Sequence, residues 1–157
     1  MIYLERILLG MKRVPLRSKD LQELLSGYDF VIAKKDLVEV VDDKIILINK
    51  KPCFFYYEKR VVPTLQILQT QHLLKKIVVD MGAVKFLVGG ADVMRPGIKE
   101  IDLTIQKDDF VVVVDINNKK ALCVGIALFS GEEMLQLHSG KMIKNIHFIG
   151  DGIWTFI

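Results

Sequence analysis

Apolar residues in the first half of the chain form four short runs separated by charged or turn-forming residues. The runs are rich in β-branched and aromatic side chains, which is typical of strands. They cover residues 30–33, 37–41, 45–48 and 53–57. Turn residues separate the later runs, at Asp42-Asp43 and from Asn49 to Pro52. The pattern predicts a small β-meander.

One helix is predicted to pack on this meander. Ser18 is a residue type that caps helix starts, because its hydroxyl accepts a hydrogen bond from a free backbone N–H. Leu21, Leu24 and Leu25 then recur on one helical face, and Gly27 follows as a stop. We expect the three leucines to face the sheet.

Two further segments flank the meander. Residues 2–9 alternate poorly and fit either a strand or a short helix. After Pro63-Thr64, apolar residues recur at helical spacing up to Leu74, which predicts a second helix. Lys75-Lys76 follows without a Gly/Ser/Pro-rich linker, so we expect two domains that meet near residues 75–78 and pack together.

The second half is organised around residues 79–97. Asp80 is predicted to cap a short helix in which Met81, Val84 and Val88 form one apolar stripe. Lys85 falls outside that stripe and should face water.

Two glycine-containing segments follow this helix, and each predicts a change of chain direction. Gly89 and Gly90 are predicted to end it, since glycine adopts left-handed backbone geometry without steric cost. Pro96-Gly97 is predicted as a turn in which the glycine supplies a positive φ. Residues 98–105 then have the pattern of an irregular connection.

The remaining pattern predicts three strands of a small closed barrel. They cover residues 110–114, 121–129 and 142–149, with a hairpin loop at 117–120, a bulge at Gly125 and a turn at 150–152. Ser130 and Glu133 are spaced as a capping box for a helix over residues 131–137. We expect Trp154 and Phe156 to close one end of the barrel.

Composition places the chain among packed proteins. Of its 157 residues, 51% are hydrophobic and 26% charged, which argues against disorder. No apolar run approaches the length of a membrane span, and the first fifteen residues lack the order of a secretory signal, so we expect no membrane association and a cytoplasmic location. Cys53 and Cys123 lie far apart in apolar runs and are expected to be buried thiols.

Charge is distributed unevenly. Residues 1–77 contain 14 Lys+Arg and 9 Asp+Glu, a net charge of +5, whereas residues 78–157 contain 8 and 10, a net charge of −2. The basic excess therefore lies in the first half. Its exposed cations are expected at Lys12, Arg13, Arg17, Lys34, Lys35, Lys50 and Lys51.

The chain carries no recognisable catalytic or cofactor motif. A P-loop lysine and hydroxyl are missing after the glycines, and there are too few strand–helix–strand units for a dinucleotide fold. His72, His138 and His147 are scattered without a second ligand nearby, so we expect no metal site, and His147 should be a core or barrel-edge residue. We therefore predict no catalytic residues, no cofactor and no enzymatic activity.

The glycine stretch is the best candidate for ligand binding. Two adjacent glycines let a ligand backbone approach, and Ala91, Asp92 and Arg95 follow at once. Such a loop suits a phosphodiester chain or a nucleotide end. The alternative is a tight helix-to-strand connection with no ligand, which a lone glycine motif more often turns out to be.

The same stretch carries a family resemblance. Residues 79–86 read VDMGAVKF and residues 90–98 read GADVMRPGI; ALCVG at 121–125, Gly140-Lys141 and NIHFIGDGIW at 145–154 extend the match. This half resembles a PUA domain, an RNA-binding module. The ending, together with Pro63-Thr64-Leu65, is similar to the branch that contains the ligatin and malignant-T-cell-amplified-sequence proteins and their archaeal relatives.

The resemblance implies an α+β fold of two domains, a pre-PUA domain over 1–77 and a PUA pseudo-barrel over 78–157. It implies RNA binding in translation, to tRNA or to ribosomal RNA of the small subunit. Alternatives are docking of a protein partner by residues 1–77, or an accessory role in an RNA-modification enzyme. The RNA-binding residues carried over are Lys85, Gly89, Gly90, Ala91, Asp92, Met94, Arg95, Pro96, Lys141 and Lys144.

Overall fold

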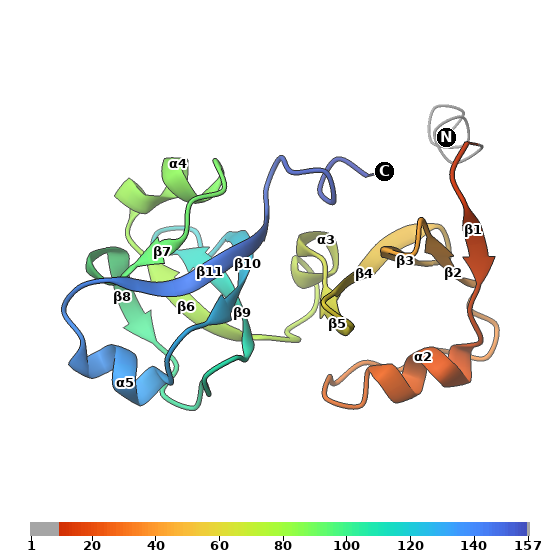
Figure 1. Cartoon of the computed structure of the whole chain (residues 1–157), viewed down its shortest axis with the longest axis horizontal. Coiled ribbons are helices and arrows are strands. Elements are labelled where there is room, and N and C mark those ends of the chain that lie inside the picture. The colour runs from red at the N-terminus through yellow and green to blue at the C-terminus, as the bar shows by residue number, and fades with distance from the viewer. Residues whose placement is uncertain (1–9, 157) are drawn as a thin grey trace.

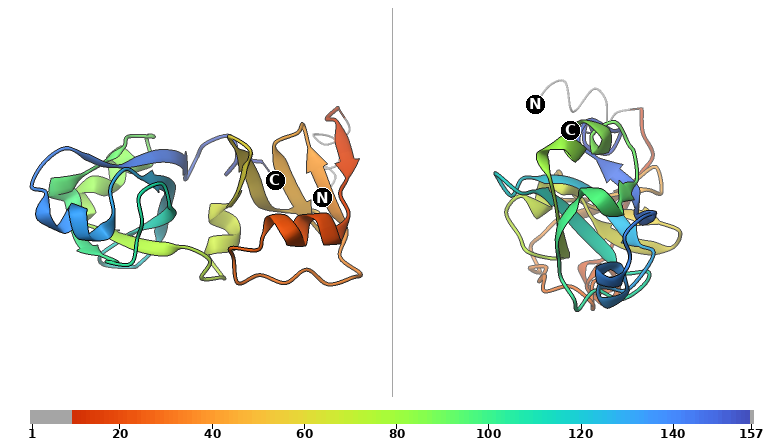
Figure 2. Two further views of the ribbon diagram at one scale, coloured as in Figure 1. Left: turned by 60° about the horizontal axis from the view of Figure 1, so that its bottom comes forward. Right: turned by 90° about the vertical axis from the view of Figure 1, so that its left-hand side faces the viewer.

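The computed structural model describes residues 10–156 and has an α+β fold that is mostly β. A five-stranded antiparallel sheet is followed by a six-stranded half-barrel, and the two lie end to end along the long axis of the molecule (Figures 1 and 2). The predicted fold class is confirmed. The expectation for residues 2–9 lies outside the described residues.

The first sheet is a meander in chain order. Its strands are β1 (Arg13–Pro15), β2 (Val38–Val41), β3 (Ile45–Ile48), β4 (Lys51–Tyr57) and β5 (Arg60–Pro63). Asp42-Asp43, Asn49-Lys50 and Glu58-Lys59 make the tight connections, each with two consecutive positive φ angles. Such turns match the right-handed twist of paired strands, which explains why three hairpins follow one another.

Helix α2 (Ser18–Leu24) covers this sheet with Leu21 and Leu25 fully buried. Leu24 was predicted on the same face, but its exposure is 48%. Ser18 is the first helical residue rather than the cap, since Arg17 occupies the cap position without a side-chain hydrogen bond. Gly27 lies beyond the end of the helix, which stops at Leu24.

Two other predictions in this half were wrong. Residues 30–33 are not a strand, because the side chain of Gln22 takes the place of a neighbouring strand: its amide donates to Phe30 O at 2.8 Å and accepts from Ile32 N at 2.8 Å. The second predicted helix, α3, covers only Leu65–Leu68, capped by Thr64, and residues 69–74 continue without helix.

The half-barrel has the strand order β7-β11-β10-β9-β6-β8. Its strands are β6 (Lys75–Val79), β7 (Val93–Met94), β8 (Ile98–Ile101), β9 (Phe110–Asp115), β10 (Ala121–Ala127) and β11 (Lys141–Phe148). Strands β6 and β9 are parallel and the other pairs antiparallel. The irregular connection predicted for 98–105 was wrong in its first part, since β8 pairs with β6.

Local predictions for the half-barrel hold at two places. Helix α5 (Gly131–Gln136) begins with the capping box of Ser130 and Glu133. The β10–β11 register shifts at Gly125, where an added Cβ would collide with Ile143 Cγ2 and lie 2.7 Å from Lys144 O. Glycine is therefore required at this bulge because two strands approach closely.

The two sheets share a hydrophobic cluster. Phe55 and Leu65 from the first half pack with Val112, Val124 and other residues of the half-barrel. The expectation that the two halves pack together is thereby met, whereas the domain boundary at 77/78 stays a prediction. The strand that opens the second sheet begins at Lys75.

The chain end crosses between the two sheets. Trp154 packs against the shared cluster, and Phe156 packs against Val41, Ile45 and Leu47 on the first sheet. Phe156 therefore does not close the barrel, contrary to the prediction, because the turn after β11 directs the chain away from it (Figure 1). Within residues 10–156, none of the helices has the length and apolar character needed to cross a membrane.

Candidate nucleic-acid interface

The predicted site residues gather at one edge of the half-barrel, where β7 and β11 meet a short helix. Asp80 caps the 3-10 turn η1 (Met81–Ala83) by accepting from Ala83 N at 3.0 Å, as predicted. Helix α4 (Val84–Leu87) continues from it. Leu87 is buried, whereas Met81 is 41% exposed and thus does not belong to the predicted apolar stripe.

A left-handed residue ends helix α4. Gly90 has φ +94°, whereas Gly89 does not have a positive φ. The Ala91 N–H donates to Phe86 O at 3.0 Å, which closes the helix end. An added Cβ at Gly90 would lie 3.0 Å from the Phe148 ring, so the backbone at this position packs directly on an aromatic side chain.

The turn that follows was predicted partly wrongly. Arg95–Gly97 forms a second 3-10 turn, η2, with proline near its start. Gly97 does not have a positive φ. An added Cβ at this position would lie 3.6 Å from Ala83 Cβ, an ordinary van der Waals distance, so packing does not require a glycine there either.

Asn145 locks the glycine loop to strand β11. Its side-chain amide donates to Leu87 O at 3.1 Å and to Ala91 O at 2.9 Å. Its backbone N–H donates to Asp92 Oδ1 at 2.8 Å. Sequence reasoning did not place Asn145 in the site, although an asparagine among the apolar residues of a predicted strand was the available signal.

Asp92 and Lys141 form an ion pair of 2.8 Å across β7 and β11. Partial burial would raise the pKa of Asp92, but the Lys141 ammonium and the Asn145 N–H outweigh it and hold that pKa below its usual range. The positive charge of Lys141 is thus largely balanced within the protein.

The Arg95 guanidinium is held by hydrogen bonds within the protein. Its Nε donates to Met134 O at 2.8 Å and its Nη1 to Ile98 O at 3.3 Å, so the guanidinium joins helix α5 to the start of β8. Backbone carbonyls at a helix end attract a cation, which stabilises this arrangement. Arg95 is half-buried in this position.

Exposed apolar and basic side chains surround the glycine loop. Phe86 is 59% exposed and Met94 is 49% exposed, although both are large hydrophobic residues. The Lys85 ammonium lies 5.0 Å from the centre of the Phe86 ring, and Lys141 pairs with Met94 across the strands. We call the surface formed by Lys85, Phe86, Gly90, Met94 and Lys141 the glycine-loop face.

The other predicted site residues lie around or apart from this face. Gly89, Ala91 and Asp92 belong to the loop itself, and Pro96 follows in η2. Lys144 lies further along β11, with its ammonium 5.8 Å from the Tyr57 ring of the first sheet, and that tyrosine raises the pKa of Lys144. Contact of any of these residues with RNA stays a prediction.

Four of the seven basic residues singled out in the first half form ion pairs. Lys12 lies 3.3 Å from Asp43, and Arg17 lies 2.9 Å from Asp20. Arg13 and Lys50 both pair with Glu39, at 3.9 and 2.9 Å. Lys34, Lys35 and Lys51 form no ion pair within residues 10–156, and the net charge of +5, which already counts the acidic partners, attracts a polyanion.

The side chains of His147 and of the two cysteines are buried or half-buried. His147 is fully buried, as expected. Cys123 is buried, which raises the pKa of its thiol to about 12, and Cys53 is half-buried. Among residues 10–156, no three His, Cys, Asp or Glu side chains come close enough to hold a metal ion.

Comparison with known proteins agrees with this architecture. Residues 75–149 match the PUA domain. An uncharacterized protein of Methanocaldococcus jannaschii is 46% identical over 97% of this chain and 96% of its own length. Malignant T-cell-amplified sequence 1 of Rattus norvegicus is 32% identical, over 79% of this chain and 73% of its own length.

Two further proteins are similar to this chain. Translation machinery-associated protein 20 of Eremothecium gossypii is 30% identical, over 82% of this chain and 77% of its own length. The crystal structure of a hypothetical protein of Pyrococcus horikoshii superposes with a TM-score of 0.80 at 35% identity, covering 91% of this chain and 98% of that one. The chain therefore belongs to the family of PUA domain proteins that includes the malignant T-cell-amplified sequence proteins and translation machinery-associated protein 20.

Proposed function

We propose that this protein binds RNA of the translation machinery, a tRNA or the RNA of the small ribosomal subunit, without catalysing a reaction. The PUA domain and the similarity to a translation machinery-associated protein support this function. We propose a cytoplasmic location on the same grounds, because ribosomes work there. The observation that carries the proposal is the pair of exposed apolar side chains, Phe86 and Met94, beside Lys85 at a glycine backbone.

Each part of the glycine-loop face has a role in this proposal. Gly90 supplies the positive φ that turns the chain out of α4 and lets the loop pack on the Phe148 ring. Lys85 attracts phosphates without reading sequence. Phe86 and Met94 offer apolar contact to unstacked bases, which is how single-stranded RNA is commonly held. Asp92, Asn145 and Arg95 hold the loop and its neighbours in place.

Binding of the whole protein to tRNA across a salt series tests the proposal. We expect affinity to fall with salt, and Lys85→Ala to weaken binding and flatten the salt dependence by about one phosphate contact. Lys107→Ala, at an exposed lysine in the turn before β9, is the matched control and should have no effect. Failure to retain tRNA or ribosomal RNA at low salt would contradict the proposal.

The same assay distinguishes two ways of reading the RNA. We expect removal of the 3′ terminal nucleotides to lower the affinity if an RNA end lies against Gly90. If trimmed and intact tRNA bind equally and Lys85→Ala still weakens both, the face contacts a helix instead. Either result leaves the location of the site intact.

A protein partner of the first half is a second candidate. Among residues 10–77, four large apolar side chains are exposed: Val14 at 42%, Leu24 at 48%, Val31 at 84% and Leu37 at 47%. A partner retained after ribonuclease treatment, and lost with Val31→Asp, would support docking through this half. A partner that is released by ribonuclease would instead be joined through RNA.

A further inference from the structure

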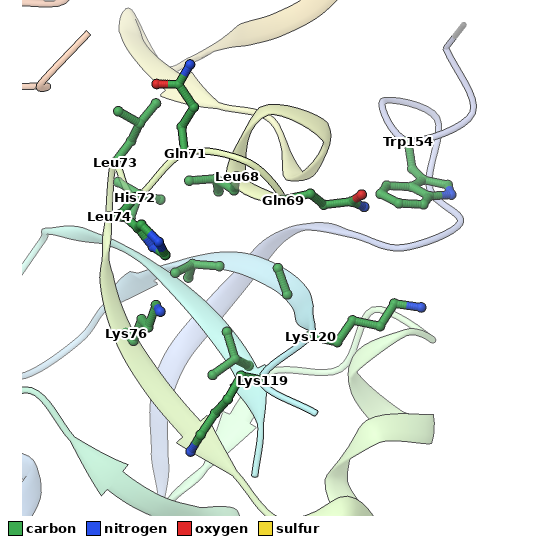
Figure 3. A pocket seen from close by; sticks show the side chains of 13 residues that line it. Leu68, Gln69, Gln71, His72, Leu73, Leu74, Lys76, Lys119, Lys120 and Trp154 are labelled. Atoms are coloured by element: carbon green, nitrogen blue, oxygen red, sulfur yellow. The ribbon is translucent and has the colours of Figure 1, made fainter. Parts of the chain in front are cut away.

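A cleft of about 460 Å³ lies between the two sheets, and none of its lining residues belongs to the glycine-loop face (Figure 3). Its floor is apolar and includes Val112 and Val114 of β9. Leu68, at the end of α3, forms part of the opposite wall. The volume lies within the range of about 300–1,000 Å³ that is usual for small-ligand sites.

The rim of this cleft is basic. Lys76 comes from β6, while Lys119 and Lys120 come from the loop between β9 and β10. Lys119 lies 3.3 Å from Glu100 and is partly neutralised. Lys76 and Lys120 are exposed and form no ion pair within the part of the chain that the structure describes. Two cations are thus available to an anionic ligand.

An aromatic wall completes the cleft. Trp154 lines it, and Figure 3 shows the Gln69 amide directed toward the indole ring. The backbone of Trp154 is fixed on both sides, because its N–H donates to Asp151 Oδ1 at 2.8 Å and its carbonyl accepts from Gln66 Nε2 at 3.1 Å. An aromatic side chain that lines the same cleft as an apolar floor is suited to a planar base, and the neighbouring cations are suited to its phosphates.

The basic loop connects this cleft to the glycine-loop face. Ile116 N, at the start of the loop, donates to Val79 O at 2.9 Å, one residue before the cap of η1. The loop therefore lies beside the start of the helix that carries Lys85. A polynucleotide that leaves the glycine-loop face along this helix would meet Lys120 next.

We propose that the cleft is a second RNA site that takes one unpaired nucleotide, with its base against Trp154 and its phosphates at Lys76 and Lys120. The choice of RNA as the source of that nucleotide rests on the proposed function. An acidic peptide could also meet two lysines, but the aromatic wall and the enclosed apolar floor favour a flat base with adjacent phosphates.

The intrinsic fluorescence of the protein reports on this site directly, because Trp154 is the only tryptophan in the chain. We expect a single-stranded hexanucleotide of adenosine to quench the fluorescence of the full-length protein. The double variant Lys76→Ala, Lys120→Ala should weaken this binding and lower its salt slope by about 1.4, since each phosphate contact on a single strand contributes about 0.7. Lys107→Ala should leave the quenching curve unchanged.

Several outcomes would overturn the cleft site. Quenching that Lys85→Ala abolishes and the double variant leaves unchanged would place the nucleotide at the glycine-loop face. Equal quenching by a peptide of glutamate and leucine, in competition with the hexanucleotide, would make the cleft a peptide site. Normal tRNA retention without any quenching by the hexanucleotide would remove the cleft site and leave the proposed function standing, whereas loss of tRNA retention alone would remove the proposed function.

Discussion

His147 Nε2 accepts a hydrogen bond from the Leu65 backbone N–H at 3.0 Å, which ties the last strand of the half-barrel to the first turn of α3. This contact fixes the tautomer: Nε2 is the acceptor, so the proton lies on Nδ1 and points to Asp151 Oδ2 at 2.8 Å. The imidazole is fully buried between the two sheets, where its ring lies edge-on to Phe55. His147, which lies in a strand predicted from the sequence, therefore helps to connect the two halves of the protein.

Replacing His147 should weaken the contact between the two halves of the protein. His147→Phe keeps an aromatic ring but leaves the Leu65 N–H without its acceptor and Asp151 without one of its donors. A buried polar group without a partner costs about 1–3 kcal/mol, so we expect a loss of that size in the free energy of unfolding by urea. His138→Phe, at an exposed position, is the matched control and should change stability by less than about 0.5 kcal/mol. Equal stability of the two variants would contradict a structural role of the contact.

Stability should fall in acid through Asp151. Burial alone would raise the pKa of this carboxyl, but hydrogen bonds from His147, Trp154 N and Phe148 N hold it below its usual value. A group with a lowered folded-state pKa adds stability that is complete above its unfolded pKa of about 3.9 and is lost as the pH falls through the folded value.

Asp151→Asn should remove that contribution. We expect the variant to be less stable than the parent at pH 7 and to lose less stability than the parent between about pH 5 and pH 2. Urea unfolding at several pH values measures both effects. Parallel stability curves for the two proteins would show that Asp151 does not carry the acid dependence.

Sequence patterns predicted best where a local rule and the tertiary structure agree. The run at 110–114 became a strand buried on both faces, and Ser130 with Glu133 formed the expected capping box. The bulge at Gly125 was predictable because this glycine interrupts an apolar run in the sequence. In each case one residue or run has few alternative structures.

Two of the wrong predictions involve partners that lie outside the local sequence pattern. Apolar residues 30–33 read as a strand, but the Gln22 side chain satisfies their backbone. The hydrogen bonds of the Arg95 guanidinium to Met134 O and Ile98 O were not foreseen either, and contact of this residue with RNA stays a prediction. Phe156 was expected to close the barrel, but its side chain packs on the first sheet. Periodicity and spacing do not encode such pairings, so they could not be predicted from the sequence alone.

The occupied guanidinium changes what a mutation of Arg95 should show. Hydrogen bonds to charged groups contribute about 1.5–3 kcal/mol, so Arg95→Ala should lower the free energy of unfolding by roughly that amount. Arg95→Lys should recover only part of the loss, because an ammonium lacks the planar fork that reaches both carbonyls. Thermal or urea unfolding checks both variants. If Arg95→Ala retains full stability while RNA binding is lost, the side chain contacts RNA rather than holding the fold.

The glycine loop offers a comparison of two positions with the same backbone strain. Gly90 has φ +94° and Gly150 has φ +96°, so alanine is strained at both. An added Cβ at Gly150 meets nothing within 4 Å, whereas one at Gly90 lies 3.0 Å from the Phe148 ring and would have to shift that ring or the glycine loop. We expect Gly90→Ala to weaken tRNA binding well beyond its effect on stability, and Gly150→Ala to cost stability alone. If the two variants bind tRNA equally after unfolded protein is subtracted, the backbone at Gly90 does not approach the RNA and the loop is a connection between helix and strand.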